Sequence, residues 1–245
     1  MSTKIFAHRG ASKQAPENTM AAFTLAYQHG ADGIETDVHL TRDHIPVLIH
    51  DEHVKRTTSS TGYIKDFTYR QLQKLDAGSW FSSEFAGLRI IPLDEFLEWI
   101  YDKPLYLNIE LKNNKIDYND LESIVYDRIL HYDLLHRTIL STFNPRSLNK
   151  LNYLNRDINT ALLTTKRGKN LVSAAQELGA NAVHIKYRLL NQFLVDKCHH
   201  EAMGVRVYTV NRPRQMLRCF AVGCDAIFTD VPDRAIRFRN QFTNQ

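Results

Sequence analysis

The chain has 245 residues, with 31 Lys and Arg against 27 Asp and Glu, so its formal net charge is +4 with histidine neutral. Its composition, 43% hydrophobic and 24% charged residues, is that of a folded globular protein and excludes a largely disordered chain. The small, unclustered charge excess argues against a nucleic-acid-binding protein. No apolar run reaches the roughly 18 residues that a membrane span needs, so we expect no transmembrane segment.

The N-terminus and the cysteines favour a cytoplasmic location. The chain opens with MSTK and goes directly into a short strand-like stretch, without the long apolar core of a signal peptide. Cys198, Cys219 and Cys224 give an odd count with no CxxC spacing. We therefore expect reduced thiols rather than a disulfide framework or a zinc knuckle.

Short apolar runs alternate with longer amphipathic segments along the chain. The expected strands are residues 5–7, 33–40, 105–111, 138–141, 159–163, 182–185, 205–210 and 226–229. The expected helices are residues 18–29, 121–132, 170–178, 190–202 and 214–221, with three more beginning at Pro92, Pro145 and Pro232. In the first of these helices, Asn18 is the expected N-cap and Gly30 the C-terminal stop.

Eight strands, each followed by a helix, predict a parallel sheet. The length of the chain favours a closed (β/α)₈ TIM barrel, expected as a single domain over residues 1–245. After the second strand, residues 45–49 run back as an extended segment, and residues 51–91 form an irregular stretch with one helical piece near 68–76. We expect this stretch to be a small insertion. The alternative, an open doubly wound sheet, normally carries a glycine-rich loop after its first strand, and none is found here.

Carboxylates gather where the predicted strands end, which is where barrel enzymes carry their reactive groups. Glu35 and Asp37 are two residues apart on one strand and share a face, as do Glu110 and Lys112 on another. Three carboxylates from two strands suit a hard cation such as Mg²⁺ or Ca²⁺. The alternative is structural ion pairing with Arg9 or Lys112, and the acids alone do not separate the two.

Two histidines favour catalysis. His8 and His50 follow different strands at the same end of the barrel, and such a pair supplies one general base and one general acid near neutral pH. Asp51 is placed to orient His50 if the two side chains touch. Arg9 and Lys112 add positive charge that suits phosphate oxygens. This combination matches the needs of phosphoryl transfer.

Other polar residues have structural interpretations. We expect Asp230 to brace the last strand-to-helix turn rather than to bind metal. For His184 and Lys186, contact with a ligand at the mouth is the less favoured interpretation. The residues expected to be solvated surface are His199, His200, Lys166, Arg167 and Lys169.

The order of motifs closely resembles that of the glycerophosphodiester phosphodiesterases, within the PLC-like phosphodiesterase superfamily. The matching segments are HRG at 8–10, PENT at 16–19, GIETDV at 33–38, TRD at 41–43, VLIHD at 47–51, RTT at 56–58, ELK at 110–112, TVN at 209–211 and FTD at 228–230. DAGSWF at 76–81 and IPL at 91–93 also match the insertion of that family. The resemblance covers nearly the whole chain.

By this resemblance, the enzyme hydrolyses glycerophosphodiesters, as small-molecule substrates, to glycerol 3-phosphate and an alcohol. It implies that one divalent cation, Mg²⁺ or Ca²⁺, is held by Glu35, Asp37 and Glu110. It further implies that His8 and His50 are the acid–base pair and that Arg9 and Lys112 hold the phosphate. The substrate's own neighbouring hydroxyl is a plausible nucleophile, since an intramolecular attack gains a large effective molarity.

The shape of the substrate pocket is not predicted, because the roles of three aromatic residues remain open. Tyr208 stands where the family often has Trp, and Trp80 and Phe81 either line the pocket or anchor the insertion. Two other functions remain as alternatives. A lysophospholipase-D-like activity would need an exposed apolar groove near the mouth, and a non-catalytic barrel could bind a phosphate ligand without turning it over. The oligomeric state is not predicted.

Overall fold

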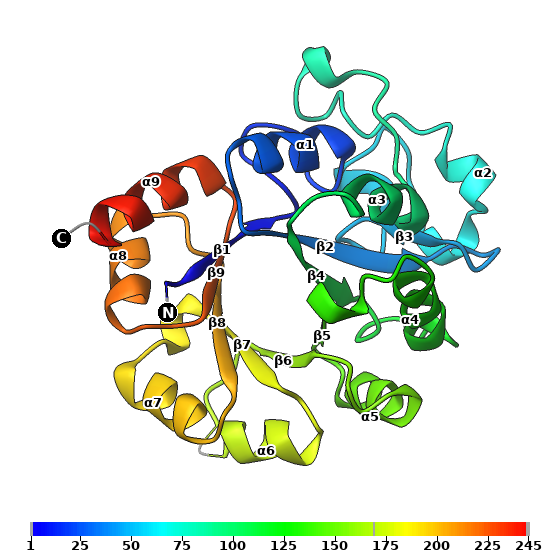
Figure 1. The fold of residues 1–245 in the computed structure, drawn as a ribbon. Helices are drawn as coiled ribbons and strands as arrows, with labels where there is room; N and C mark the ends of the chain where they lie inside the picture. The colour runs from blue at the N-terminus through cyan, green and yellow to red at the C-terminus, as the bar shows by residue number, and fades with distance from the viewer. Residues whose placement is uncertain (1, 169, 244–245) are drawn as a thin grey trace.

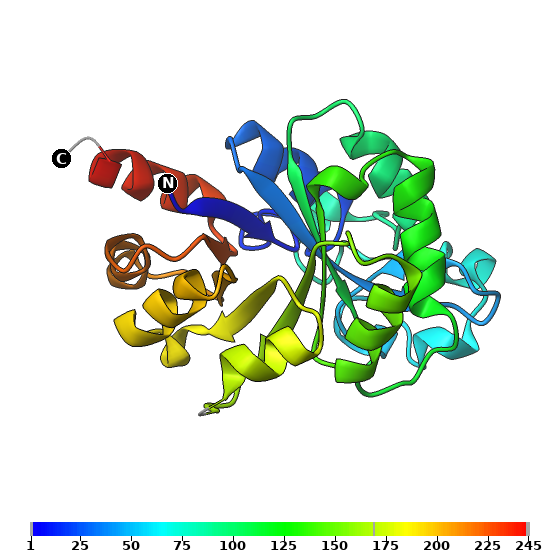
Figure 2. The same cartoon turned by 60° about the horizontal axis from the view of Figure 1, so that its bottom comes forward.

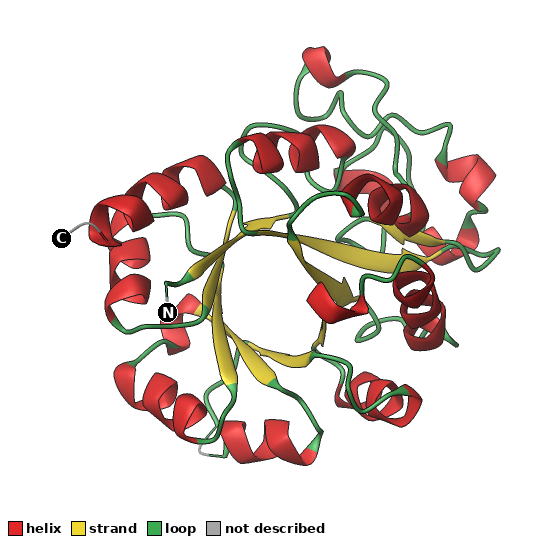
Figure 3. Cartoon of the chain, in the orientation of Figure 1, coloured by secondary structure: helices red, strands yellow, loops and turns green. Residues whose placement is uncertain are grey.

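Eight parallel strands close into a barrel in the computed structural model, which describes residues 2–168 and 170–243 (Figures 1 and 3). They are β1 (Lys4–His8), β2 (Gly33–Leu40), β4 (Tyr106–Leu111), β5 (Thr138–Thr142), β6 (Thr160–Thr164), β7 (Ala182–Lys186), β8 (Gly204–Tyr208) and β9 (Ala226–Thr229). The strand order runs β1-β9-β8-β7-β6-β5-β4-β2, and pairing of β1 with β2 closes the ring. The predicted TIM barrel is confirmed.

A ninth strand, β3 (Pro46–Leu48), pairs antiparallel with the end of β2 outside the ring. It is the returning segment expected from the sequence. It carries the chain from β2 back towards the barrel mouth, where His50 follows it. The predicted insertion then lies between this strand and the next long helix.

Eight helices cover the outside of the described barrel (Figure 2). They are α1 (Met20–Gln28), α3 (Leu93–Ile100), α4 (Leu121–His131), α5 (Pro145–Leu154), α6 (Leu171–Glu177), α7 (Gln192–His200), α8 (Pro213–Ala221) and α9 (Pro232–Thr243). Their apolar faces pack on the strands and on one another. Phe23 of α1 and Phe96 of α3, for example, are fully buried with ring centroids 4.7 Å apart.

The N-cap of α1 is Thr19, one residue later than the sequence indicated. The Thr19 hydroxyl accepts a hydrogen bond from the backbone N–H of Ala22. Asn18 instead has φ 57° and turns its side chain into the barrel mouth, where its amide donates to Asp37 Oδ2 at 3.1 Å. The prediction failed because Asn is a strong cap former by type, yet here a buried carboxylate takes its amide.

The insertion has a small apolar cluster of its own. Its short helices are Val54–Arg56, Ile64–Asp66, α2 (Tyr69–Leu72) and Ser83–Phe85, so the predicted 68–76 helix is shorter than expected. Buried side chains of this cluster include Val54, Ile64, Leu72 and Ile90. The cluster fixes the insertion against one side of the barrel (Figure 1).

Trp80 and Phe81 pack on other residues of the insertion. Trp80 Nε1 donates to the Ala77 carbonyl at 2.9 Å, and the Trp80 and Phe81 rings meet edge to face with centroids 5.7 Å apart. Phe81 packs in turn on Phe85. Neither residue is among those that line the catalytic cavity described below.

The lower part of the barrel is filled by apolar side chains. Phe6 and Phe228 lie with ring centroids 5.4 Å apart, and alanines at 161, 182 and 226 leave room for these rings. Above this layer the inward-facing positions become polar. The polar residues at the mouth therefore rest on a closely packed apolar layer.

Cys198, Cys219 and Cys224 are buried, free thiols. The side chains expected at the surface, at positions 166, 167, 199 and 200, are exposed, while Lys169 lies outside the described residues. Over residues 2–168 and 170–243, no helix combines the length and the apolar character required to span a bilayer.

Gly10 and Gly30 provide a matched test of packing, because both have left-handed φ values, 81° and 80°. A Cβ at position 10 would lie 2.6 Å from the backbone carbonyl carbon of Ala22, whereas one at position 30 meets no described atom within 4 Å. We expect Gly30→Ala to lower the free energy of unfolding by about 1 kcal/mol, from backbone strain. We expect Gly10→Ala to lower it by about 2–4 kcal/mol, since overpacking is added. Urea unfolding measures both, and equal losses would contradict this account.

Candidate active site

A cavity of about 320 Å³ opens at the carboxyl ends of the strands. Six of the seven site residues predicted from the sequence line it: His8, Arg9, Glu35, His50, Glu110 and Lys112. The seventh, Asp37, is buried beside them. The structure therefore brings all seven together in one place.

Glu35, Asp37 and Glu110 form a buried carboxylate cluster. One oxygen from each lies within 4.8 Å of the others. The strand register produces this arrangement, because Asp37 of β2 pairs directly with Glu110 of β4. Among the described residues, Asp37 Oδ1 has no hydrogen-bond partner although it is buried. A buried carboxylate oxygen that lacks a hydrogen bond, beside two more carboxylates, fits a hard cation, so these residues suit a divalent metal ion.

Arg9 and Lys112 bring positive charge to the cluster. Lys112 Nζ lies 2.7 Å from Glu110 Oε1 and 3.4 Å from Asp37 Oδ1. Arg9 Nε lies 3.2 Å from Asp37 Oδ2, and the Arg9 backbone N–H donates to Glu35 Oε2 at 2.9 Å. Three carboxylates nevertheless outnumber these two basic groups, which leaves room for a further positive charge.

The pKa values of the two β2 carboxyls move in opposite directions. Burial, reinforced by the charge of Asp37, raises the pKa of Glu35. Burial also acts to raise the pKa of Asp37, but Lys112 and Arg9 outweigh it and hold that pKa well below its usual range. The ionised form of Glu35 is therefore disfavoured, and a cation bound beside it would favour release of its proton.

His8 is oriented by a carboxylate from the last strand. Its Nδ1 lies 2.6 Å from Asp230 Oδ1, and because a carboxylate only accepts, Nδ1 donates. Nε2 faces the cluster, 4.0 Å from Glu35 Oε2. Burial lowers the pKa of His8, but Glu35 and Asp230 raise it more, so the net shift is upward. Asp230 also accepts from Asn211 Nδ2 at 2.6 Å, which is the expected bracing of the last turn.

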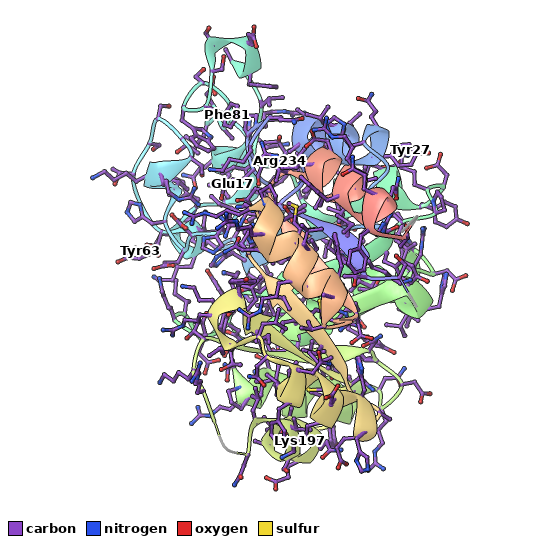
Figure 4. The ribbon with its side chains drawn as sticks, turned by 90° about the vertical axis from the view of Figure 1, so that its left-hand side faces the viewer. Glu17, Tyr27, Tyr63, Phe81, Lys197 and Arg234 are labelled. Atoms are coloured by element: carbon purple, nitrogen blue, oxygen red, sulfur yellow. The ribbon has the colours of Figure 1, made fainter. Side chains whose placement is uncertain are left out.

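His50 is held in the same way. Its Nδ1 lies 2.6 Å from Asp51 Oδ1, so the contact that sequence adjacency left open is made. Arg56, from the insertion, donates through Nε to Asp51 Oδ2 at 2.7 Å and through Nη1 to Glu17 Oε2 at 2.7 Å. Glu17 in turn accepts from Arg9 Nη1 at 3.0 Å. A continuous series of ion pairs thus joins the insertion, both histidine-bearing loops and the carboxylate cluster (Figure 4 labels Glu17).

His184, Lys186 and Tyr208 also line the cavity. His184 is fully buried and accepts from Arg206 Nη1 through Nε2 at 3.1 Å. The Tyr208 hydroxyl, which a tryptophan would not have, donates a hydrogen bond to the Thr164 backbone carbonyl at 2.9 Å. The Tyr208 ring stands perpendicular to Phe143 and forms an aromatic wall of the cavity.

Oriented histidines, a carboxylate cluster and two basic groups in one barrel mouth are the groups that phosphoryl transfer needs. The model of the glycerophosphoryl diester phosphodiesterase family matches residues 8–234. The chain belongs to this family, as the order of motifs indicated.

Relatives of this family match the chain over nearly its full length. A glycerophosphodiester phosphodiesterase of Caldanaerobacter subterraneus is 40% identical over 96% of this chain and 97% of its own. One of Bacillus altitudinis is 38% identical over 98% of this chain and 99% of its own. A solved phosphodiesterase of Oleispira antarctica, in complex with the product sn-glycerol-3-phosphate, superposes with a TM-score of 0.90. It is 30% identical and covers 98% of this chain and 97% of that one.

The sequence did not predict that Asp230, Glu17 and Arg56 would contact residues of the site. Asp230 was expected to brace a turn, and it also orients His8. Closure of the barrel was the available signal, since Ala7 pairs with Thr229 and the residues that follow each must meet. Glu17 and Arg56 stand in recognised motifs, but no periodicity or spacing indicated that they would form one ion-pair network.

The raised pKa of Glu35 predicts that cation binding releases a proton. Affinity for Mg²⁺ or Ca²⁺ should rise with pH, by up to roughly tenfold per pH unit while Glu35 is protonated in the free protein. Calorimetry at several pH values measures both affinity and proton release. Glu35→Gln should weaken binding and abolish the proton release.

His8 contacts Glu35 and could contribute to the same slope, so His8→Ala is the matched control. We expect this variant to keep the pH dependence of binding. Affinity that does not change with pH, or unchanged binding in Glu35→Gln, would remove Glu35 from the ligand set.

Proposed function

We propose that the chain, as one barrel domain with its insertion, hydrolyses glycerophosphodiesters to glycerol 3-phosphate and an alcohol with the help of a divalent cation. The observation that carries the proposal is the pair of histidines in one cavity, each with Nδ1 2.6 Å from a carboxylate, beside the carboxylate cluster. Membership of the family and the product named for the Oleispira relative support the choice of substrate.

The histidines would move protons. A carboxylate on Nδ1 fixes each ring with Nε2 free, so one imidazole can accept a proton while the other, as imidazolium, donates one. One histidine takes the proton from the substrate's neighbouring glycerol hydroxyl, whose oxygen bonds to phosphorus. The bond from phosphorus to the alcohol oxygen breaks, and the other histidine protonates that oxygen. Water then opens the cyclic phosphate with the two roles exchanged.

The remaining charged groups would hold the phosphoryl group. Arg9 offers its guanidinium fork and Lys112 its ammonium to the phosphate oxygens, and both already reach the carboxylate cluster. Glu35, Asp37 and Glu110 would hold the cation. When bound, such a cation supplies charge stabilisation for the phosphoryl oxygens.

We further propose a cytoplasmic role in the use of glycerol and lipid-derived phosphodiesters. Three buried, free thiols suit a reducing compartment.

The first test is release of glycerol 3-phosphate from glycerophosphocholine and glycerophosphoethanolamine by protein stripped with EDTA. We expect no release until Mg²⁺ or Ca²⁺ is restored. Absence of release with every ion would contradict the proposal. Parallel assays on lysophosphatidylcholine then separate a lysophospholipase-D-like activity from a barrel that only binds phosphate.

His8→Ala and His50→Ala variants assign the chemistry within that assay. Each should lower kcat by about 10²–10⁴-fold, the range for loss of a general acid or base, without loss of the fold. His136→Ala, which removes an exposed histidine, is the control and should retain full activity. Near-normal turnover in either site variant would overturn the acid–base assignment.

Arg56 is expected to act through Asp51 as a positioning residue. Arg56→Met leaves Asp51 and Glu17 without their shared partner, so we expect kcat to fall by about 10–100-fold with a smaller change in KM, the usual size for loss of an orienting contact. Arg56→Lys should recover part of the loss, because an ammonium restores the charge but not the fork.

The control for Arg56 is Lys55→Met, which removes an exposed cation from the same short helix. The pH profile of kcat should move in Arg56→Met and stay in place in Lys55→Met. A kcat for Arg56→Met within twofold of the wild-type value would exclude the positioning role.

A further inference from the structure

A second concavity lies outside the catalytic cavity, between helices α6 and α7. Its volume is about 520 Å³, and we name it the α6–α7 groove. The side chains that define it are Lys166, Arg167, Leu171, Phe193, Leu194 and Lys197. Phe193, in the first turn of α7, is 77% exposed and lines the groove together with Leu171 and Leu194, so the apolar surface there is continuous rather than a single ring.

The groove has an apolar wall and a basic rim. Its described lining contains Lys166, Arg167 and Lys197 and no carboxylate. Asp196, on the same helix, accepts a hydrogen bond from Gln192 Nε2 instead and is not part of the lining. The groove therefore matches a partner that is apolar in one part and anionic in another.

A second groove on the same molecule carries charge of the opposite sign. Along α5, a concavity of about 420 Å³ carries Tyr153, which is 93% exposed. Its lining holds Asp120 and Glu122 with Lys150, and Lys150 is paired with Glu122 at 3.3 Å. The two grooves thus share an exposed aromatic ring but differ in the sign of their charge.

The α6–α7 groove opens at the same end of the barrel as the catalytic cavity. Leu163 of β6 lines the cavity, and Lys166, three residues further on, lines the groove. In the same way, Lys186 at the end of β7 lines the cavity, and Leu189, three residues further on, lines the groove. Arg188 Nη2 donates to the Thr165 carbonyl at 2.6 Å and ties the two loops together.

The insertion leaves the groove uncovered. Helices α6 and α7 lie across the barrel from the insertion (Figure 1), and Lys197 and Phe81 lie at opposite ends of the view in Figure 4. The described part of the chain therefore offers no segment that covers Phe193.

We propose that the α6–α7 groove docks the protein on an anionic phospholipid bilayer. Phe193 and Leu194 enter the boundary between headgroups and acyl chains, and Lys166, Arg167 and Lys197 contact the lipid phosphates. An exposed aromatic side chain with basic residues in the same groove suits a membrane interface. The basic residues are attracted to the anionic headgroups, and the aromatic ring is buried among the lipids. Docking there brings the mouth of the catalytic cavity next to the lipid surface.

The test is cosedimentation of the full chain with vesicles. We expect binding to vesicles of phosphatidylglycerol and phosphatidylcholine and little binding to phosphatidylcholine alone. Phe193→Ser should weaken this binding, and the pair Lys166→Glu with Arg167→Glu should weaken it by at least about tenfold, because each basic residue near an anionic surface contributes to the attraction.

Tyr153→Ser is the matched control, since it removes an equally exposed aromatic ring from the groove of opposite charge. It should leave binding unchanged, and all variants should keep the thermal unfolding midpoint of the wild type. The readout involves no turnover, so its outcome is independent of the proposed catalytic activity.

Three results would overturn the proposal. The first is no binding of the wild type to anionic vesicles, and the second is an equal loss of binding in Phe193→Ser and Tyr153→Ser. The third is a dimer, seen by sedimentation equilibrium without lipid, that Phe193→Ser dissociates, because the occupant of the groove would then be a second copy of the chain.

Discussion

The buried carboxylate cluster is the constraint on which the rest of the mouth depends. Parallel pairing of β2 with β4 places Glu35, Asp37 and Glu110 together, and like charges held this close in a buried site are unfavourable unless they are compensated. The surrounding polar residues compensate the charge of the cluster. Lys112 and Arg9 neutralise part of the charge, and Asn18 gives up its helix-capping role to hold Asp37.

The same need explains why an insertion of irregular structure contributes to the site. Arg9 is shared between Asp37 and Glu17, and Glu17 is shared between Arg9 and Arg56. Arg56 extends this series to Asp51, which orients His50. The apolar cluster under the insertion fixes the segment that carries Arg56, so packing far from the carboxylates contributes to the orientation of a histidine in the cavity.

The fold and the seven proposed site residues could be predicted because both depend on local pattern. Strand periodicity places Glu35 and Asp37 on one face, and the alternation of strands and helices identifies the barrel end at which His8 and His50 meet. Contacts that depend on closure or on the path of an irregular loop could not be predicted in this way. Asp230 meets His8 because β9 closes on β1, and Arg56 meets Glu17 because the first short helix of the insertion lies against the loop that follows β1.

Charge balance connects the cluster to the proposed substrate. Because the raised pKa of Glu35 favours its neutral form, Asp37 and Glu110 only balance Arg9 and Lys112, and the centre of the mouth has no net positive charge to attract an anionic ligand. A divalent cation that displaced the Glu35 proton would give these groups one net positive charge, and a phosphodiester carries one negative charge. The cation would also take over the compensation of the carboxylates, so Arg9 and Lys112 would become available to the phosphate oxygens of the proposed substrate. On the proposed function, the mouth would attract its substrate best with the cation in place, which would order the two binding events.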